Sequence, residues 1–135
     1  MFKLYKGLNK DIRYVRESVF VKEQGFENEF DITDENCFHV VFYENENPVA
    51  TCRYFKQNNI YHIGRVAVLK EYRGFNIGNK IMQFAENEIK KAGGKSVEVS
   101  AQVRIKDFYN KLGYVEQGEI YLDEFCEHIK MVKVL

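Results

Sequence analysis

The stretch Val66-Ala-Val-Leu-Lys-Glu-Tyr-Arg-Gly-Phe-Asn-Ile-Gly-Asn-Lys80 decides the fold of this chain. It starts as the apolar end of a strand pattern, passes through a short polar turn, and enters a helix pattern with two glycines near its start. A helix start leaves backbone N–H groups unpaired and carries about half a positive charge, and glycines let a ligand approach the main chain closely. The stretch therefore predicts an anion site suited to a pyrophosphate.

Two common phosphate-binding motifs do not fit this turn. The dinucleotide-binding fingerprint needs three glycines at a fixed spacing, which the turn lacks. The phosphate loop of nucleotide hydrolases fails because Gly74 and Gly78 are too close together and Lys80 is followed by Ile81. Both nucleotide classes are excluded, and a turn without a ligand remains the alternative interpretation of the glycines.

Outward from this turn, the chain alternates between strand and helix patterns. Apolar residues recur every three or four positions from Ile77 to Ala92, which is typical of an amphipathic helix, and Gly93 follows it. On the N-terminal side, Asn9 is a suitable N-cap for a helix that ends near Gly25. The other patterns predict strands at 2–5, 38–43, 49–55, 60–69, 95–100, 114–120 and 129–134, and a helix at about 103–112.

These elements predict the fold class. The runs 38–43 and 49–55 flank a polar connection with Pro48 and should pair as an antiparallel hairpin, and the run 60–69 is expected to be a buried, central strand. A strand, helix, strand, helix order after a hairpin predicts an α/β domain with a mixed, mostly antiparallel sheet and helices on both faces. No linker or repeat divides the chain, so residues 1–135 are expected to form a single domain.

The composition limits the partners and the compartment. Twenty Lys and Arg balance twenty Asp and Glu, so no field of one sign gathers nucleic acid or an anionic membrane. Three cysteines without Cys-x-x-Cys spacing and three scattered histidines form no disulfide framework and no local metal motif, so no metal is expected. Because the chain has neither a signal-like nor a membrane-spanning apolar run, we expect a cytoplasmic protein.

Residues 27–35 are acidic and irregular, and we expect them to form a mobile surface loop. Their charge suggests an acceptor with positive charge, such as a polyamine or an amino sugar. The alternative is a charged loop that is only solvated.

Several motifs resemble the GNAT superfamily of N-acetyltransferases. Arg73-Gly-Phe-Asn-Ile-Gly78 resembles its Arg-x-x-Gly-x-Gly signature, the turn that cradles the coenzyme A pyrophosphate. Gly64-Arg-Val-Ala-Val68 is similar to its splayed central strand, and Phe108-Tyr-Asn-Lys-Leu-Gly-Tyr114 to its Phe-Tyr-x-x-x-Gly-Phe helix and strand. Phe20-Val-Lys-Glu-Gln24 and His128-Ile-Lys-Met131 further resemble the small ElaA-like subgroup, so that the resemblance covers nearly the whole chain.

The resemblance implies a single GNAT-type domain with splayed central strands that uses acetyl-CoA. Main-chain groups of Val66, Ala67 and Val68 would hold the pantetheine arm. Asn76 stands where the family usually has a glycine, and Asn tolerates left-handed backbone better than most residues. This departure motivates the alternative of a non-catalytic acyl-CoA sensor. The phosphates would lie against Arg73, Gly74, Phe75, Asn76, Ile77, Gly78 and Asn79.

Acetyl transfer to an amine needs a neutral nucleophile and a stabilised thiolate. A lysine-like amine loses its proton at pH 7 at a cost of about 4.6 kcal/mol, whereas an α-amine needs only about 1 kcal/mol. Tyr109 resembles the family's general-acid tyrosine, and the alternative is a core tyrosine whose hydroxyl is satisfied. Candidates for the base or for acceptor binding, each of which could also be structural, are Glu23, Gln24, Glu98, His62 and His128.

The expected reaction moves an acetyl group from acetyl-CoA to the primary amine of a small molecule by direct attack in a ternary complex. The acceptor would be an amino sugar, a polyamine or a similar compound. Cys126 has no histidine paired with it by motif and is expected to be a buried thiol rather than a nucleophile. An exposed last strand could pair across a two-fold axis, which favours a homodimer.

Overall fold

The structure is a computed structural model that describes residues 1–135. Strands and helices alternate along it much as the patterns predict, with boundaries that differ by a few residues. The elements are β1 (Phe2–Lys6), α1 (Lys10–Arg16), a π-helical segment (Glu17–Glu23), α2 (Thr33–Asn36), β2 (Phe38–Glu44), β3 (Asn47–Gln57), β4 (Ile60–Val68), a 3₁₀ turn (Lys70–Tyr72), α3 (Ile77–Lys91), β5 (Ser96–Gln102), a second 3₁₀ turn (Val103–Ile105), α4 (Lys106–Lys111), β6 (Val115–Asp123) and β7 (Cys126–Val134).

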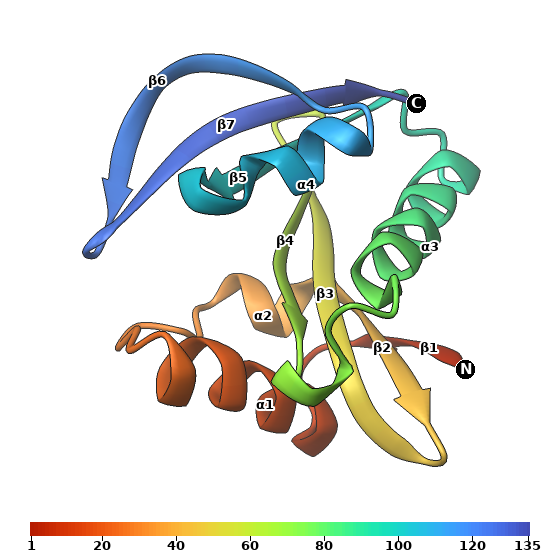
Figure 1. Cartoon of the computed structure of the whole chain (residues 1–135). Coiled ribbons are helices and arrows are strands. Elements are labelled where there is room, and N and C mark those ends of the chain that lie inside the picture. The colour runs from red at the N-terminus through yellow and green to blue at the C-terminus, as the bar shows by residue number, and fades with distance from the viewer.

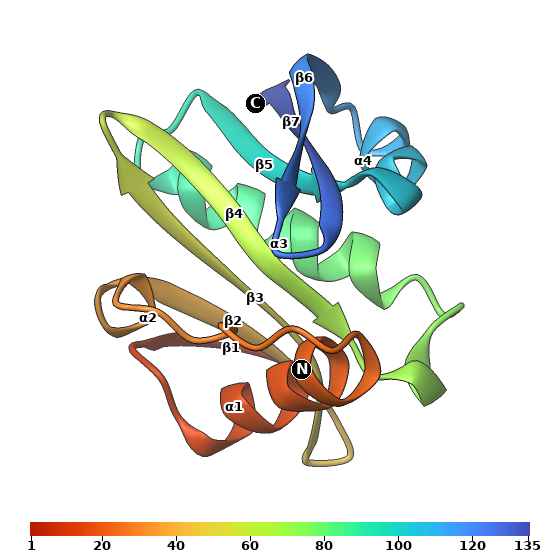
Figure 2. The same cartoon turned by 90° about the vertical axis from the view of Figure 1, so that its left-hand side faces the viewer.

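The seven strands form one mixed sheet that opens in the middle. Their order is β1-β2-β3-β4-β5-β7-β6, and every neighbouring pair is antiparallel except β4 and β5. The parallel pair is joined only where Tyr61 lies opposite Val97 and His62 opposite Glu98. Beyond these residues the two strands diverge, as Figures 1 and 2 show. The predicted mixed sheet with splayed central strands is confirmed.

A bulge in β4 accompanies the divergence. The register against β3 shifts between Thr51 and Arg53, and Arg65 of the opposing stretch has a positive φ of 50°. Such a bulge bends a strand and increases its local twist. The bend turns the end of β4 away from β5.

Helices cover both faces of the sheet, as predicted. Successive side chains of a strand point to opposite faces, and on β2 Val40 belongs to the main core whereas Val41 packs with Ile12 of α1. The main core also contains Ile81 and Met82 of α3. In Figure 2, α1 lies in front of the strands and α3 behind them.

The first helix continues into a segment with wider turns than the sequence pattern indicates. The Asn9 side chain caps it by accepting a hydrogen bond from the Ile12 N–H at 2.9 Å, and the predicted apolar face is buried. After Arg16 the segment is π-helical, and the N–H of Gln24 donates to the carbonyl of Val19, five residues back. This spacing brings Val19 and Gln24 to the same side of the segment.

The acidic segment 27–35 is not a mobile, solvated loop. It contains the short helix α2, and its carboxylates Glu29 and Asp34 are buried against the equally buried Arg16. The Arg16 guanidinium lies 2.7 Å from Glu29 and 2.6 Å from Asp34, and Arg53 lies 2.8 Å from Asp34. A buried charge needs such partners, so these carboxylates are internal supports and do not attract a cationic acceptor.

Three other expectations about burial are wrong. The last strand is not an edge, because β7 lies between β5 and β6 and the sheet ends at β6. Only part of β4 is buried, because cavities adjoin its C-terminal half. The Cys126 thiol is half-buried, since it sits at the hairpin end that joins β6 and β7.

Replacing Asp34 should be far more costly than replacing Asp31. Asp34→Asn removes the one carboxylate that both buried guanidinium groups share and leaves Arg16 only Glu29 and Arg53 only the partly exposed Asp31, so the free energy of unfolding should fall by about 3–5 kcal/mol. Asp31, whose side chain is 39% exposed, also pairs with Arg53, and Asp31→Asn should cost about 1 kcal/mol or less. Urea unfolding at pH 7 measures both values, and equal losses would contradict the internal role of Asp34.

The same network predicts acid sensitivity. Burial alone would raise the pKa of Asp34, but hydrogen bonds from Arg16 and the Asp31 N–H, together with the Arg16 and Arg53 charges, hold that pKa well below its usual range. A carboxyl group whose pKa is lowered on folding stabilises the fold above its unfolded value of about 3.9 and loses this contribution as the pH falls further. Wild type should therefore lose stability below about pH 4, and Asp34→Asn should flatten this dependence.

Candidate active site

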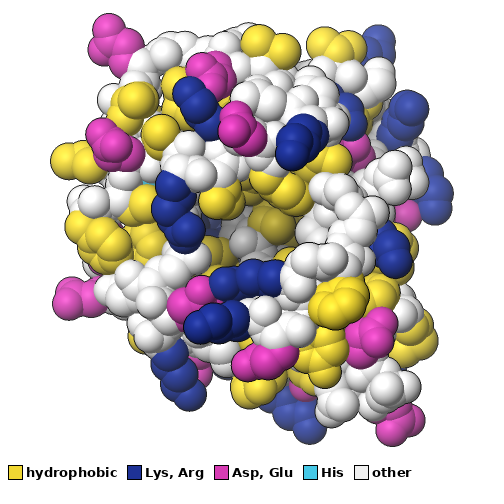
Figure 3. All heavy atoms as spheres, viewed as in Figure 1, with side chains coloured by type: hydrophobic (Ala, Val, Ile, Leu, Met, Phe, Trp, Pro, Cys, Tyr) yellow, Lys and Arg dark blue, Asp and Glu magenta, His cyan; other side chains and the backbone are white.

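A cavity of about 440 Å³ opens where β4 and β5 separate. Its walls are the end of β4, the turn before α3, and α4 with the 3₁₀ turn before it. Figure 3 shows a hollow with apolar side chains around it on the face seen in Figure 1. Nine of the ten residues predicted for the donor line this cavity, and Phe75 is the exception because its side chain points outward and is 67% exposed.

The start of α3 presents free backbone N–H groups to this cavity. Asn76 is the N-cap and has left-handed backbone with φ 65°, and the first N–H to find a helical acceptor is that of Lys80. The N–H groups of Ile77, Gly78 and Asn79 therefore have no helical acceptor. The first turn contains no acidic residue, so the partial positive charge of the helix start is not neutralised.

Packing against Phe108 requires a glycine at position 78. A Cβ atom at this position would lie 3.1 and 3.2 Å from two ring carbons of Phe108. The Phe108 ring in turn packs edge-on against Tyr109, with ring centroids 5.0 Å apart. The glycine therefore allows α4 to approach the start of α3 and helps to position Tyr109.

The Arg73 side chain holds the turn in place. Its Nε donates to the Val68 carbonyl at 2.9 Å, and its two terminal nitrogens donate to the Glu23 carboxylate at 2.6 and 2.7 Å. These bonds join the end of β4, the turn and the end of the π-helical segment. The hydrogen bond from Arg73 lowers the pKa of Glu23, which makes this carboxylate a weaker base. Glu23 lines neither this cavity nor the second, smaller one described below.

A second, smaller cavity of about 190 Å³ adjoins the first. Tyr109 lines both cavities, as do Gln24, Val66 and Ile105. Tyr109 is 6% exposed, and no protein group hydrogen-bonds its hydroxyl, whereas the buried Tyr114 hydroxyl donates to Glu86 at 2.7 Å. Burial raises the pKa of Tyr109, so its phenol stays protonated at neutral pH. Tyr109 is thus a residue shared by the two cavities, and its protonated hydroxyl has no hydrogen-bond partner in the protein.

Gln24 and His128 meet in the second cavity, as the sequence-based candidates for the acceptor side. Gln102, which the sequence did not single out, joins them by donating from Nε2 to the Gln24 Oε1 at 2.9 Å. The Nδ1 of His128 is hydrogen-bonded to the Cys126 carbonyl at 3.0 Å. A carbonyl can only accept, so Nδ1 carries a proton and Nε2 of the neutral ring has a lone pair.

Glu98 and His62 do not join this group. They lie opposite each other where β4 and β5 still pair, and neither lines either cavity. Glu98 is 3.5 Å from His62 and 3.9 Å from Lys130, and the His62 ring stacks on Phe55. Both belong to the closed end of the sheet.

Several residues that line the second cavity were not identified from the sequence. Arg65 comes from the bulge, and Asp123 and Glu124 come from the end of the β6–β7 hairpin. Gln102 could be found only through the strand register, which places it opposite His128. These residues are far apart along the chain and form no motif.

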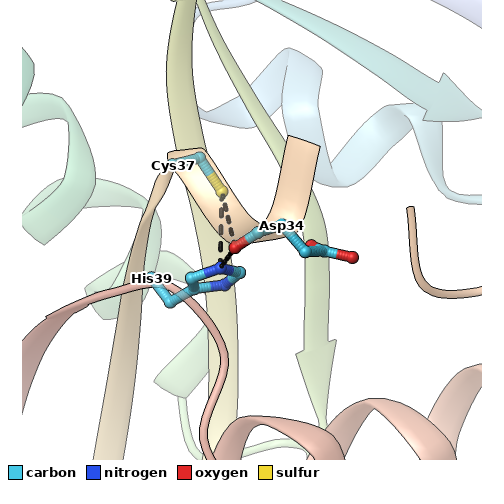
Figure 4. Close-up of side chains that lie close together, drawn as sticks. All are labelled: Asp34, Cys37 and His39. Atoms are coloured by element: carbon cyan, nitrogen blue, oxygen red, sulfur yellow. Dashed lines mark hydrogen bonds between the residues drawn. The ribbon is translucent and has the colours of Figure 1, made fainter. Parts of the chain in front are cut away.

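Asp34, Cys37 and His39 form a buried cluster of metal-ligating types, shown in Figure 4. The ring Nε2 of His39 lies 3.0 Å from the Asp34 carbonyl and 3.4 Å from the Cys37 sulfur. Both carboxylate oxygens of Asp34 already accept hydrogen bonds from arginine side chains. Burial raises the pKa of Cys37 to about 11, so it is a thiol at neutral pH. Two adjoining guanidinium charges and a protonated thiol do not suit a cation.

Comparison with known proteins agrees with this geometry. The sequence profile of the family described as the acetyltransferase (GNAT) domain matches residues 9–135. The N-acetyltransferase YjcF of Bacillus subtilis, which is itself uncharacterized, is 35% identical over 127 residues, covering 92% of this chain and 91% of YjcF.

Two solved structures extend the comparison. Escherichia coli ElaA is 26% identical and superposes with a TM-score of 0.88 over 98% of this chain and 99% of its own. An aminoglycoside 6′-N-acetyltransferase complexed with coenzyme A has the same fold, with a TM-score of 0.79 at 14% identity over 99% of this chain and 96% of its own.

The fold and the profile match define the class of protein. The chain belongs to the GNAT family of acetyltransferases, and it is an acyl-CoA-dependent N-acetyltransferase. Proteins of this family use acetyl-CoA as the donor. None of the helices is long and apolar enough to cross a membrane.

Gly78→Ala tests the packing at the start of α3. The added Cβ presses on the Phe108 ring, which Tyr109 holds from the other side, so overpacking of about 1–3 kcal/mol should exceed the gain of up to about 1 kcal/mol in helix propensity. A net loss of about 1 kcal/mol in the free energy of unfolding is expected. Gly64→Ala is the control, because a Cβ there meets nothing within 4 Å. Equal effects in the two variants would contradict the packing role.

Proposed function

We propose that this protein transfers the acetyl group of acetyl-CoA directly to the primary amine of a small molecule, within a ternary complex. The acceptor class is an amino sugar, a polyamine or a similar compound. One observation carries the proposal: Tyr109, whose hydroxyl has no partner in the protein, lines both the cavity at the start of α3 and a second, more polar cavity. The two cavities would hold donor and acceptor at the same time, with the reacting carbonyl near the phenol.

The donor would occupy the larger cavity. Its volume of about 440 Å³ falls within the usual range of ligand sites. The diphosphate would accept hydrogen bonds from the free N–H groups at the start of α3, and the pantetheine arm would pair with Val66, Ala67 and Val68. Arg73 would position the turn through Val68 and Glu23.

The reaction balances with the groups in the two cavities. The amine nitrogen attacks the thioester carbon, so an N–C bond forms and the C–S bond breaks. Neutral His128, in the second cavity, accepts a proton from the nitrogen at Nε2. The departing sulfur takes a hydrogen bond from the Tyr109 phenol and finally a proton from solvent, and His128 returns the proton that it accepted to solvent.

Tyr109 would act chiefly as a hydrogen-bond donor. A phenol with its ordinary pKa of about 10 is already a weaker acid than a thiol of about 8.5, and burial raises the pKa of Tyr109 further. Complete proton transfer to the thiolate therefore costs more than about 2 kcal/mol. Stabilisation of the developing sulfur charge by the intact O–H avoids this cost during C–S cleavage.

Tyr109→Phe tests the central role. Removing the hydroxyl should lower kcat by about 10²-fold or more, while the Kd of acetyl-CoA changes little, because the ring and its packing remain. Release of free coenzyme A with a panel of amines measures kcat, and calorimetry measures the Kd. The exposed Tyr14, whose hydroxyl lies outside both cavities, supplies the control Tyr14→Phe. Unchanged turnover in Tyr109→Phe would remove this residue from the mechanism.

Two substitutions at Asn76 test whether the turn before α3 binds acetyl-CoA. Glycine adopts a positive φ without strain, so Asn76→Gly should keep the Kd of acetyl-CoA within about 3-fold of wild type. Asn76→Val should weaken binding about 5- to 30-fold, because left-handed backbone costs such a residue about 1–2 kcal/mol. Asn45, with φ 49° in the hairpin turn, gives the control Asn45→Val, which introduces similar strain away from the cavity. Equal loss of acetyl-CoA affinity in both valine variants would refute the donor turn.

The remaining parts of the proposal concern the setting of the reaction. We place the protein in the cytoplasm, where three free cysteines suit a reducing environment, and we assign no metal to the reaction. The alternative of a non-catalytic acyl-CoA sensor rested on Asn76 in place of a glycine. Asn76 adopts the left-handed backbone that the turn requires, so this residue no longer favours the alternative.

A homodimer would form through the free edge of β6 and not through the last strand, β7, and light scattering would measure the mass of the particle in solution.

A further inference from the structure

We infer that Gln102 and His128 together recognise the two N–H groups of an unsubstituted primary amine, so that the enzyme rejects N-alkylated amines. The inference rests on the proposed function and names the acceptor chemistry of the same site. It assigns Gln102 as an amine-binding residue and the second cavity as the acceptor site.

Strand register brings the two side chains together. Gln102 at the end of β5 lies directly opposite His128 of β7 in an antiparallel pair, so both side chains are on the same face. Both line the second cavity together with Tyr109, and both are buried. Two polar side chains therefore adjoin the phenol in one small space.

Gln102 has one carbonyl oxygen without a partner. Its Nε2 donates to Gln24, which fixes the amide, and its Oε1 is buried without any hydrogen bond in a residue that is only 9% exposed. A buried acceptor without a partner is destabilising, so a group that donates to this oxygen gains a favourable bond. An N–H of the acceptor amine is such a group.

His128 also has one ring nitrogen that can accept a hydrogen bond. Its Nδ1 proton is used by the Cys126 carbonyl, so Nε2 is the nitrogen that can accept. The Tyr121 ring stacks on the imidazole with centroids 6.0 Å apart and an angle of 26° between the planes, which holds its orientation. The site thus has two acceptors on neighbouring strands, Gln102 Oε1 and His128 Nε2.

A neutral primary amine matches this arrangement. Its lone pair must face the thioester carbon during attack, which leaves two N–H groups to donate, one to each acceptor. An N-methyl amine has a single N–H and leaves Gln102 or His128 unbonded. One unmade hydrogen bond to a buried acceptor corresponds to about 5- to 150-fold in kcat/KM.

The size of the cavity limits the part of the acceptor that enters. About 190 Å³ is below the usual range for a whole drug-sized ligand, so the site encloses the amine and a short stem. The only cationic side chain in the wall, Arg65, is already paired with Glu29 and Asp31. Two of the three carboxylates in the wall, those of Glu29 and Glu124, already accept hydrogen bonds from Arg16 and from two backbone N–H groups.

The experiment compares matched amines with the full chain and acetyl-CoA. The probes are ethylamine and 2-aminoethanol, each beside its N-methyl derivative, and 1,4-diaminobutane beside its N,N′-dimethyl derivative, in which both amines are secondary. N-methylation changes the basicity of these amines little. Wild type should prefer each primary amine by about 5- to 150-fold in kcat/KM. Gln102→Met, similar in size but without the carbonyl, should reduce this preference to about 3-fold or less by slowing only the primary amines.

Two variants and one binding measurement make the result decisive. Gln102→Glu keeps an acceptor oxygen and should retain the preference, and Glu119→Gln, on an exposed strand outside the cavity, should match wild type. An unchanged Kd for acetyl-CoA shows that the variants are folded. Equal rates for primary and N-methyl amines in wild type, or a preference that survives in Gln102→Met, would overturn the inference and leave the proposed function standing. Tight acetyl-CoA binding without turnover of any amine would remove both.

Discussion

The separation of two parallel strands is the constraint on which the rest of this structure depends. Because β4 and β5 pair only at Tyr61 and His62, the edge of β4 that faces β5 is left without a strand partner near Val66. Backbone polar groups must find partners, and here a ligand can supply them. The bulge at Arg65 bends β4 and so opens a cavity on each side of Val66. Sheet geometry thus places the two cavities next to each other.

Buried charge stabilises the wall of the acceptor cavity. Arg16 holds Glu29 and Asp34, and burial raises the pKa of Glu29 although Arg16 and Arg65 adjoin it. The segment fixed in this way reaches the β6–β7 hairpin, where the Glu124 carboxylate accepts hydrogen bonds from two backbone N–H groups at 3.1 and 3.3 Å. A segment that looked like a solvated loop is therefore part of the site's framework. The buried carboxylates of this segment, Glu29 and Asp34, are paired with arginine side chains.

The sequence predicted the lining of the larger cavity better than that of the second cavity, for a physical reason. The donor turn is local: Gly74, Asn76 and Gly78 carry their conformational requirements within a few residues. The acceptor wall joins Gln102 and His128 through a strand register, which no local pattern encodes. The π-helical turns after Arg16 were missed because the apolar spacing of that segment also fits an α-helix. The burial of Asp34 was missed because a carboxylate is expected to be exposed unless it has cationic partners. Its partners Arg16 and Arg53 are distant in the sequence and come close only in the fold.

Under the proposed function, the larger cavity is the donor site and the second cavity the acceptor site, and the enzyme can change its acceptor without changing its donor. The donor site is mostly backbone from one continuous stretch, 66–79, so most side-chain substitutions there leave its hydrogen-bonding groups in place. The acceptor site uses side chains from the π-helical segment's end, β5 and β7, which lie on rigid elements. A substitution at Gln24 or Gln102 would alter amine recognition without moving the turn before α3. Because Tyr109 is held by Phe108 and Tyr114, the leaving-group chemistry would also be preserved while the acceptor changes.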